Sequence, residues 1–374
     1  MAEADIGLGK TARPAYSLDD IAIVPNRRTR DPDLVDLSWE IDAFTFDLPF
    51  LAAPLDGVVS PATAAEIGRI GGVAVLDLEG IWTRHADAAA ALAELAELPL
   101  DKATARLREL LASPILPELV HDRIRELRAA GVVSAGAVTP QRTVDLADTI
   151  VAAELDLLVI HGTVVSAEHV TGEHDEPLNL KTFVRRLDIP VIVGGCTSYQ
   201  SALHLMRTGA AGVLVGGAAT SDDINRDVLG IGIPQATALA DVRAARMRHL
   251  DETGVYVQVI AAGPIATGGD VAKAIAVGAD AVVLGPPLAA ATEAPAGGTW
   301  WGQSAGHPLL ARGGLVRAPA LGSLEDVLVG PARDDHGRTN VFGGLRATMA
   351  MTGYRSLKEL QKAELIVNPQ GGRR

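Results

Sequence analysis

The chain has 374 residues, with 39 glycines, 3% aromatic residues, one cysteine and a net charge of −13 at pH 7. This length suffices for one large domain or two smaller ones, and few aromatic residues favour alternating helices and strands. The acidic balance excludes DNA or RNA as a general partner, because a polyanion would be repelled. One cysteine excludes a disulfide framework and a cysteine-rich zinc site, so we expect no metal and a reducing compartment.

No apolar run approaches the roughly 20 residues of a membrane-spanning helix. The opening MAEADIGLGKTARPAY also has no positively charged segment followed by an apolar one. We therefore expect no membrane segment and a cytoplasmic location.

Short apolar runs recur along the chain, and most of them precede a turn and a helical pattern. Their hydrophobicity is continuous rather than alternating, which is typical of strands buried on both faces of a parallel sheet. The eight runs are PFLAAPLD (49–56), GGVAVLD (71–77), GVVSAGAV (131–138), LDLLVIHG (155–162), PVIVGG (190–195), AAGVLVGG (210–217), YVQVIAAG (256–263) and ADAVVLGP (279–286).

The segments between these runs carry helical periodicity. An inward apolar stripe is clearest in SYQSALHLMRTGA (198–210) and GGDVAKAIAVGA (268–279). Eight strands alternating with helices predict an α/β fold, a (β/α)₈ TIM barrel. A doubly wound sheet is disfavoured because no Gly-x-Gly-x-x-Gly run follows an early strand.

One segment, from about residue 85 to residue 130, breaks this alternation. It is rich in alanine, leucine and charged residues, as in HADAAAALAELAEL and PELVHDRIRELRAAG. The pattern predicts two or three helices inserted between the second and third strands. We expect one of them to be a barrel helix and the rest to form an extra helical hairpin, within a single barrel domain spanning 1–374.

Four pieces of the sequence occur in an order and spacing that match one known family. They are SLDDIAIVP (17–25), AAPLDGVVSPATAAEIGRIGGVAVL (52–76), GDVAKAIAVGADAVVLG (269–285) and LRATMAMTGYRSLKEL (345–360). Together they resemble the IMP dehydrogenase and GMP reductase family. The bacterial IMP-dehydrogenase-related subfamily is the most similar part of that family.

This resemblance implies a purine nucleotide of the IMP or GMP class as ligand, NAD or NADP as cofactor, and a homotetramer or homo-octamer. It also implies that segment 345–360 returns to the nucleotide site. The insertion at 85–130 stands where dehydrogenases of the family carry a pair of CBS modules. Because it is too short for that pair and shows no β pattern, we expect no CBS regulation.

Residues 213–239, VLVGGAATSDDINRDVLGIGIPQATAL, resemble the family's active-site loop. The second half matches its Gly-x-Gly-x-Pro-Gln run, Arg226 matches its arginine, and Gly217 lies in its glycine-rich, phosphate-binding turn. Asp223 stands about where the family has its nucleophilic cysteine. A carboxylate is a poor nucleophile at an aromatic carbon, so Asp223 is either an acid–base group or part of a solvated turn.

The expected phosphate site also departs from the family. Gly263 and Gly285 remain in the loops after strands seven and eight, where barrels of this kind bind phosphate. Ala262, however, stands where the resemblance places a ribose-binding aspartate, and Pro264 and Pro286 have no N–H to donate. Each lost donor to a charged group is worth about 1.5–3 kcal/mol, although a shifted pose could recover part of it.

Further candidates follow other strands. His161 ends the fourth strand and is either a general base or a structural histidine, while Asp56 follows the first strand and is either a catalytic carboxylate or a helix cap. Cys196 follows the fifth strand and is predicted to be a small buried apolar residue rather than a displaced nucleophile. Trp300 and Trp301 either stack on a ring or anchor their loop.

Two hypotheses about function result. The first is an oxidoreductase of IMP dehydrogenase or GMP reductase type whose divergent active site lacks the loop cysteine. The second is a catalytically inactive paralogue that binds a nucleotide or a partner and regulates purine metabolism. The fold alone does not decide between them, because barrels host unrelated reactions.

Overall fold

The eight apolar runs coincide with eight strands. The computed structural model describes residues 4–162, 164–169, 178–216, 229–302, 314–333 and 335–368. The strands are β6 (Phe50–Ala52), β7 (Val73–Asp77), β8 (Ala135–Val138), β9 (Leu157–His161), β12 (Val191–Cys196), β13 (Gly212–Val215), β14 (Gln258–Ala261) and β15 (Ala281–Leu284).

These strands form a closed parallel barrel in the order β12-β13-β14-β15-β6-β7-β8-β9. The ring closes where β15 pairs with β6, with Val282 opposite Phe50. Every residue of the eight strands is buried except Gln258, because one face points into the barrel and the other packs on helices. The prediction of a (β/α)₈ TIM barrel is therefore confirmed.

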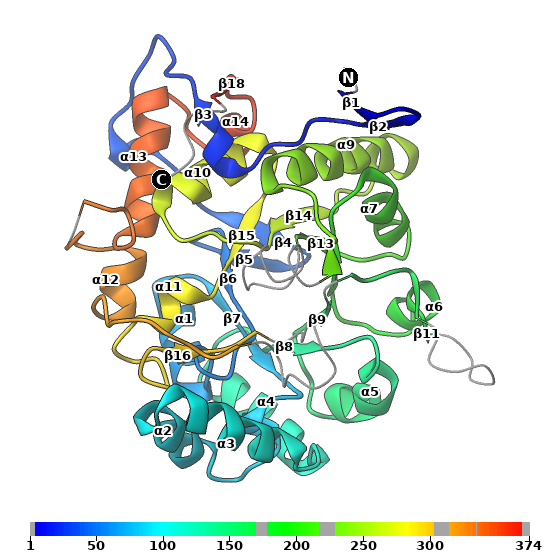
Figure 1. The fold of residues 1–374 in the computed structure, drawn as a ribbon, viewed down its shortest axis with the longest axis vertical. Helices are drawn as coiled ribbons and strands as arrows, with labels where there is room; N and C mark the ends of the chain where they lie inside the picture. Colours follow the sequence, from blue (N-terminus) through cyan, green and yellow to red (C-terminus); the bar gives the residue numbers. More distant parts are fainter. Residues whose placement is uncertain are drawn as a thin grey trace.

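Helices between the strands cover the outside of the barrel (Figure 1). Local sequence sets their ends: Ser60 accepts a hydrogen bond from the Thr63 N–H before α1, and Gly71 ends that helix with a φ of 109°. The covering helices are α1 (Pro61–Ile70), α4 (Pro117–Ala129), α5 (Thr143–Ala152), α6 (Leu180–Val184), α7 (Tyr199–Met206), α9 (Gln235–Thr253) and α10 (Gly268–Val277).

Two further helices precede α4 between β7 and β8. They are α2 (Ala88–Glu97) and α3 (Leu100–Ala112), and they form a hairpin at one end of the molecule (Figure 1). Arg317 ties this hairpin to a distant segment, because its Nη2 donates to the Leu95 and Leu98 carbonyl oxygens at 3.3 and 3.0 Å. The limits of 1–374 for one domain and 85–130 for its insertion stay predictions.

None of the described helices is both long and apolar enough to cross a membrane.

The remaining elements are short or lie outside the barrel. These elements are β1 (Ala4–Gly7), β2 (Lys10–Ala12), η1 (Leu18–Asp20), β3 (Ile21–Ile23), η2 (Pro32–Leu34), β4 (Trp39–Ile41), β5 (Phe44–Phe46), η3 (Ile81–Thr83), β10 (Glu168–His169), β11 (Leu178–Asn179), α11 (Pro286–Ala289), β16 (Thr299–Trp300), β17 (Val316–Arg317), α12 (Leu324–Leu328), α13 (Val341–Thr352), α14 (Leu357–Leu360) and β18 (Leu365–Val367).

A buried carboxylate organises the N-terminal end of the barrel. Asp280, directly before β15, is 3% exposed. Burial opposes its charge, but Arg246 and Lys358 outweigh burial and hold the pKa of the carboxyl below its usual range. The donors to its oxygens are Arg246 Nη1 at 2.7 Å, Lys358 Nζ at 2.6 Å, Tyr256 OH at 2.8 Å, Gln361 Nε2 at 2.9 Å and the Val259 N–H at 2.8 Å.

This cluster fixes the C-terminal segment away from the place expected for it. Lys358 belongs to α14 and Gln361 follows it, so both attach to the N-terminal end of β15. The expectation that all of 345–360 returns to the nucleotide site is therefore wrong for α14, because that site is expected at the C-terminal ends of the strands. The buried charge of Asp280 draws α14 to the opposite end.

Candidate binding site at the barrel mouth

A pocket with an empty volume of about 500 Å³, part of it open to solvent, lies at the C-terminal end of the barrel. Because that volume includes open solvent, the enclosed room for water-sized molecules is much smaller, about 30 Å³. The described lining residues come from seven of the eight strands or the loops that follow them. They are Leu51, Ala52, Pro54, Leu55, Val75, Val159, His161, Gly162, Gly194, Gly195, Leu214, Gly216, Ala262 and Val283.

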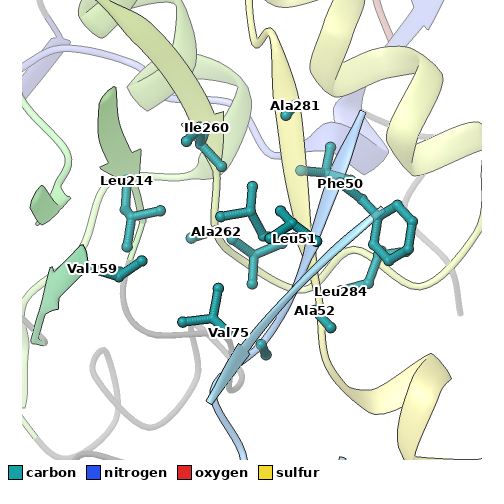
Figure 2. Close-up of a cluster of buried hydrophobic side chains, with 14 of the residues drawn as sticks. Phe50, Leu51, Ala52, Val75, Val159, Leu214, Ile260, Ala262, Ala281 and Leu284 are labelled. Carbon is teal, nitrogen blue, oxygen red and sulfur yellow. The ribbon is translucent and has the colours of Figure 1, made fainter. Parts of the chain in front are cut away.

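The described wall of this pocket is almost entirely apolar. Figure 2 shows Leu51, Val75, Val159 and Leu214 gathered inside the barrel, each from a different strand, with Ala262 beside them. Ala262 is 2% exposed, and its methyl group occupies the place where a ribose-binding carboxylate was expected. The described part of the wall therefore offers apolar contact rather than acceptors for sugar hydroxyls.

His161 is the one titratable side chain among the described lining residues. It ends β9, opposite Gly194 of β12, and it is 4% exposed. Histidine can donate or accept a proton near neutral pH, so this position suits an acid–base or hydrogen-bonding role toward a bound molecule. Its catalytic role stays a prediction.

Asp56 is buried beside the pocket but holds a neighbouring loop. Its Oδ1 accepts a hydrogen bond from the Ile81 N–H at 2.9 Å, and its backbone oxygen accepts one from Trp82 Nε1 at 3.2 Å. A Cβ on Gly80 would lie 2.1 Å from Oδ1, so this approach requires glycine. These contacts give Asp56 a loop-anchoring function, and its predicted catalytic role remains untested.

Two more buried carboxylates, which were not predicted from the sequence, lie at the end of β7 and just after it. Asp77 ends the strand and its Oδ1 accepts from the Glu79 N–H at 2.9 Å, while Glu79 Oε1 accepts from the Thr139 N–H. The run DLEG after a buried strand was the available sign, because carboxylates at that position meet the barrel rim. The Asp77 contact shapes the loop after β7, and the Glu79 contact connects this loop to the loop after β8.

The loop after β14 uses its N–H groups within the chain. Pro264 has none, and the Ile265 N–H donates to the Gly263 oxygen at 2.8 Å. The N–H groups of the next two residues donate to Asp270 Oδ2 at 3.2 and 3.0 Å. The Gly268 N–H, at the start of α10, donates to the Gly337 oxygen at 3.1 Å.

The N–H groups of the loop after β15 are likewise absent or already hydrogen-bonded. Pro286 and Pro287 open α11 without an N–H group, and the N–H groups of Leu288 and Ala289 both donate to the Gly285 oxygen at 3.0 Å. Phosphates bind helix N-termini through free N–H groups. In the described residues 264–268 and 286–289, every N–H group is absent or already engaged, and the phosphate-binding role of Gly263 and Gly285 stays a prediction.

Cys196, the chain's single cysteine, is buried at the end of a barrel strand. It ends β12, is 3% exposed, and its Sγ donates to the Leu214 oxygen at 3.3 Å. Burial raises the pKa of the thiol to about 12, although a backbone hydrogen bond opposes the shift. The thiol is therefore protonated near neutral pH and is not among the residues that line the pocket.

Gln235 of the Gly-x-Gly-x-Pro-Gln run links the loops around the mouth. Its Nε2 donates to the Val215 oxygen at 2.9 Å, and a Cβ on Gly216 or Gly263 would lie 2.9 Å from its Oε1. Gly216 is required by its φ of 113° and by the close Ala262 backbone oxygen, whereas a Cβ at Gly263 would require the Gln235 amide to shift. The predicted site residues Gly217, Asp223 and Arg226 lie outside the described residues.

The two tryptophans have different environments. Trp301 is 2% exposed and belongs to the hydrophobic core, which supports the anchoring alternative for this residue. Trp300 is partly buried and pairs with Val316 between β16 and β17. Arg317 joins this strand pair to α2 through the Leu95 and Leu98 oxygens and also donates to Thr299 Oγ1 at 3.0 Å.

Fold and pocket together define a class: a parallel (β/α)₈ barrel with a pocket at the C-terminal ends of its strands. Residues 15–305 match the family model described as the IMP dehydrogenase / GMP reductase domain. The chain therefore belongs to the IMP dehydrogenase / GMP reductase family.

Similar proteins agree with this assignment. An uncharacterized oxidoreductase from Mycolicibacterium smegmatis is 51% identical over 373 residues, covering 97% of this chain and 99% of that protein. The inosine-5′-monophosphate dehydrogenase of Methanocaldococcus jannaschii is 24% identical, covering 96% and 94%. A crystal structure of an IMP dehydrogenase/GMP reductase-like protein from Corynebacterium glutamicum is 47% identical, with a TM-score of 0.91 and 98% of each chain covered.

Proposed function

We propose that this chain is a ligand-binding member of the family that does not perform thiolate chemistry on IMP or GMP. The observation that carries the proposal is the state of Cys196, the one cysteine in the sequence. A buried thiol with a pKa of about 12 supplies almost no thiolate near neutral pH. Addition of sulfur to a purine carbon would require both a thiolate and access to the pocket.

The loops after β14 and β15 support the same proposal. A nucleotide phosphate needs N–H donors or cations. In residues 264–268 and 286–289, each N–H group is either absent or already hydrogen-bonded within the chain. The pyrophosphate of NAD or NADP also needs N–H donors or cations, and the described pocket lining contains no lysine or arginine. The described residues do not fit the charged part of a dinucleotide, so we assign no reaction step to that cofactor.

A second candidate is an active oxidoreductase with a different mechanism, the other hypothesis from the sequence. The position of His161 favours it, because a buried histidine in a pocket wall suits acid–base chemistry. The relatives named as uncharacterized oxidoreductases are consistent with either candidate. Asp223 would add a further acid–base group under this alternative.

Turnover separates the two candidates. Purified protein should show no change in absorbance at 340 nm with IMP plus NAD or with GMP plus NADPH. The same assay with the Methanocaldococcus enzyme provides the positive control. A rate on the order of 1 s⁻¹, ordinary for enzymes, would contradict the proposal.

Cys196→Ala then identifies the source of any turnover. Activity lost in this variant would assign the reaction to the thiol, and activity retained in it but lost in His161→Asn would favour the second candidate. In the inactive protein, Cys196 should react with a disulfide reagent only after unfolding. Rapid modification of the native protein at pH 8 would contradict its burial.

We also propose that the chain is cytoplasmic and forms a homotetramer or homo-octamer, as its family membership suggests. Light scattering coupled to size-exclusion chromatography measures the assembly directly. A monomer at micromolar concentration would contradict that part of the proposal.

A further inference from the structure

A second cleft lies at the N-terminal end of the barrel, at the opposite end from the mouth. It leaves about 410 Å³ of room for water-sized molecules, far more than the mouth pocket with about 30 Å³. Its described wall comes from β4 and the residue before it, the start of β14, the residue before β15, and α14. This room is sufficient for a small organic molecule.

Lys358 offers a cation to this cleft. Its Nζ donates to Asp280 Oδ1 at 2.6 Å and to the Tyr256 hydroxyl, which leaves the third N–H of the ammonium group available. The lysine side chain is 55% exposed, whereas Asp280 is buried. A ligand oxygen in the cleft can therefore reach Lys358 without displacing its existing contacts.

The Asp280 cluster contains one more cation than its carboxylate balances. Arg246 Nη1 donates to Asp280 Oδ2 at 2.7 Å and Lys358 donates to Oδ1, so two cations share one anion. Burial lowers the pKa of Lys358, Asp280 opposes this shift, and Arg246 adds to it. A carboxylate bound beside Lys358 would supply the negative charge that this cluster lacks.

Glu40 offers the opposite charge in the same wall. Its side chain is exposed and forms no ion pair or hydrogen bond with the described residues. No ion pair within 4.0 Å joins Glu40 to Lys358, although both side chains line the cleft. Gln258 adds a side-chain amide that has no hydrogen bond to the described residues. The cleft therefore presents separate groups of opposite charge, together with an amide that can donate or accept.

Apolar groups form a further part of the described wall. They are Leu357 and the rings of Trp39 and Tyr256. Trp39 stacks on Phe46 with ring centroids 5.3 Å apart, and Lys358 Nζ lies 3.9 Å from the centroid of the Tyr256 ring, so both rings are held in place. A ligand that matches this wall carries an apolar group as well as its charges.

We propose that this cleft binds a free α-amino acid with an apolar side chain. Its carboxylate accepts from Lys358, its ammonium group donates to Glu40, and the amide of Gln258 bonds to either end. A zwitterion fits because each of its charges meets a partner of opposite sign, whereas a simple anion would also face Glu40 and a simple cation would also face Lys358. The site lies apart from the mouth, so this proposal is independent of the proposed function.

Calorimetric titration compares each amino acid with two analogues that lack one of its charges. The probes are L-leucine with isocaproate and isoamylamine, and L-phenylalanine with hydrocinnamate and phenethylamine. At least one amino acid should bind, and each of its analogues should bind about tenfold or more weakly, because a charge-assisted hydrogen bond is lost. No binding by either amino acid at its solubility limit, or an analogue that binds as tightly as its parent, would overturn the proposal.

Two substitutions test the two charged ends separately. Glu40→Gln removes the partner of the ammonium group, so the amino acid and its deaminated analogue should bind within about twofold of each other. Lys358→Met removes the partner of the carboxylate and should equalise the amino acid and its decarboxylated analogue in the same way. The controls Glu97→Gln and Lys102→Met, both exposed on the α2–α3 hairpin, should leave both preferences unchanged.

Folding of the variants is checked by circular dichroism. Lys358→Met takes a donor from Asp280, so this variant is the one at risk. Glu40→Gln keeps the test valid, because the Glu40 side chain has no described hydrogen bond to lose. A folded Glu40→Gln protein that still prefers the amino acid over its deaminated analogue about tenfold would overturn the proposal.

Discussion

The N-terminal end of the barrel and the described pocket wall at its C-terminal end differ in their charged side chains. At the N-terminal end, Asp280 is buried and receives donors from Arg246, Lys358 and other groups. At the C-terminal end, the described pocket wall is apolar apart from His161. Buried charge among the described residues therefore occurs where partners surround it. Asp56, Asp77 and Glu79 beside the mouth accept backbone N–H groups, whereas the described pocket wall itself contains no aspartate, glutamate, lysine or arginine.

This difference shows that buried charge alone does not mark the site. Asp280 combines burial, a shifted pKa and several polar partners, features that often accompany catalysis. Its place at the N-terminal end indicates stability instead, because barrel active sites lie at the other end. Lys358 and Gln361 extend that function by attaching the C-terminal segment.

The largest expected effect comes from breaking the Asp280 cluster. Asp280→Ala leaves Arg246, which is 2% exposed, as an uncompensated buried charge. We expect a loss of about 3–5 kcal/mol in the free energy of unfolding, measured by urea denaturation. The control Asp145→Ala removes a partner of Arg142 in an exposed pair and should cost about 0–1 kcal/mol. Equal losses in the two variants would contradict the structural importance of the cluster.

Opposite pH dependences at the two ends sharpen the comparison. The lowered pKa of Asp280 stabilises the fold above the unfolded-state pKa of about 3.9, and this contribution disappears as pH falls through the folded-state value. Ala262→Asp should place a carboxyl in the apolar wall, where burial raises its pKa. That variant should therefore lose stability as pH rises through the raised value.

Unfolding curves between pH 3 and pH 8 measure both effects. We expect Ala262→Asp to be about 1–3 kcal/mol less stable than the parent at neutral pH, with the deficit shrinking in acid. Ala262→Asn is the uncharged control and should show no such recovery. A deficit that grows in acid would mean that the mouth contains a cation the described residues do not include.

The smallest expected effect concerns one donor of the cluster. Tyr256→Phe removes the hydroxyl that lies 2.8 Å from Asp280 Oδ1 and retains the ring below Arg246. Because other donors remain, we expect a loss of about 0.5–1.5 kcal/mol by urea denaturation. A loss as large as that of Asp280→Ala would show that the hydroxyl, rather than the cations, holds the carboxylate.

The barrel could be predicted from the sequence because its strands are buried on both faces. A continuous apolar run such as LDLLVIHG or ADAVVLGP has one main structural solution when helices alternate with it. The missing N–H groups at residues 264 and 286 could also be predicted, because every proline lacks a backbone N–H. These features depend on local chemistry, which the sequence states directly.

The partners of the site residues could not be predicted in the same way. The Gly268 N–H meets the Gly337 oxygen, and the Asp56 carboxylate meets the Ile81 N–H, contacts that only the folded chain creates. Lys358 was expected near the mouth by resemblance, but a buried carboxylate attached it to the other end. Long-range pairing therefore decided what the local patterns left open.

The hydrogen bonds of Arg317 affect the order in which the molecule can fold during synthesis. Its guanidinium occupies two carbonyl oxygens at the end of α2, one of them 222 residues earlier in the chain. A ribosome synthesises α2 long before this arginine, so the helix end must rely on water until most of the protein has emerged. The helical hairpin thus receives its final stabilising contact late in synthesis, together with the strand pair β16–β17 beside the mouth.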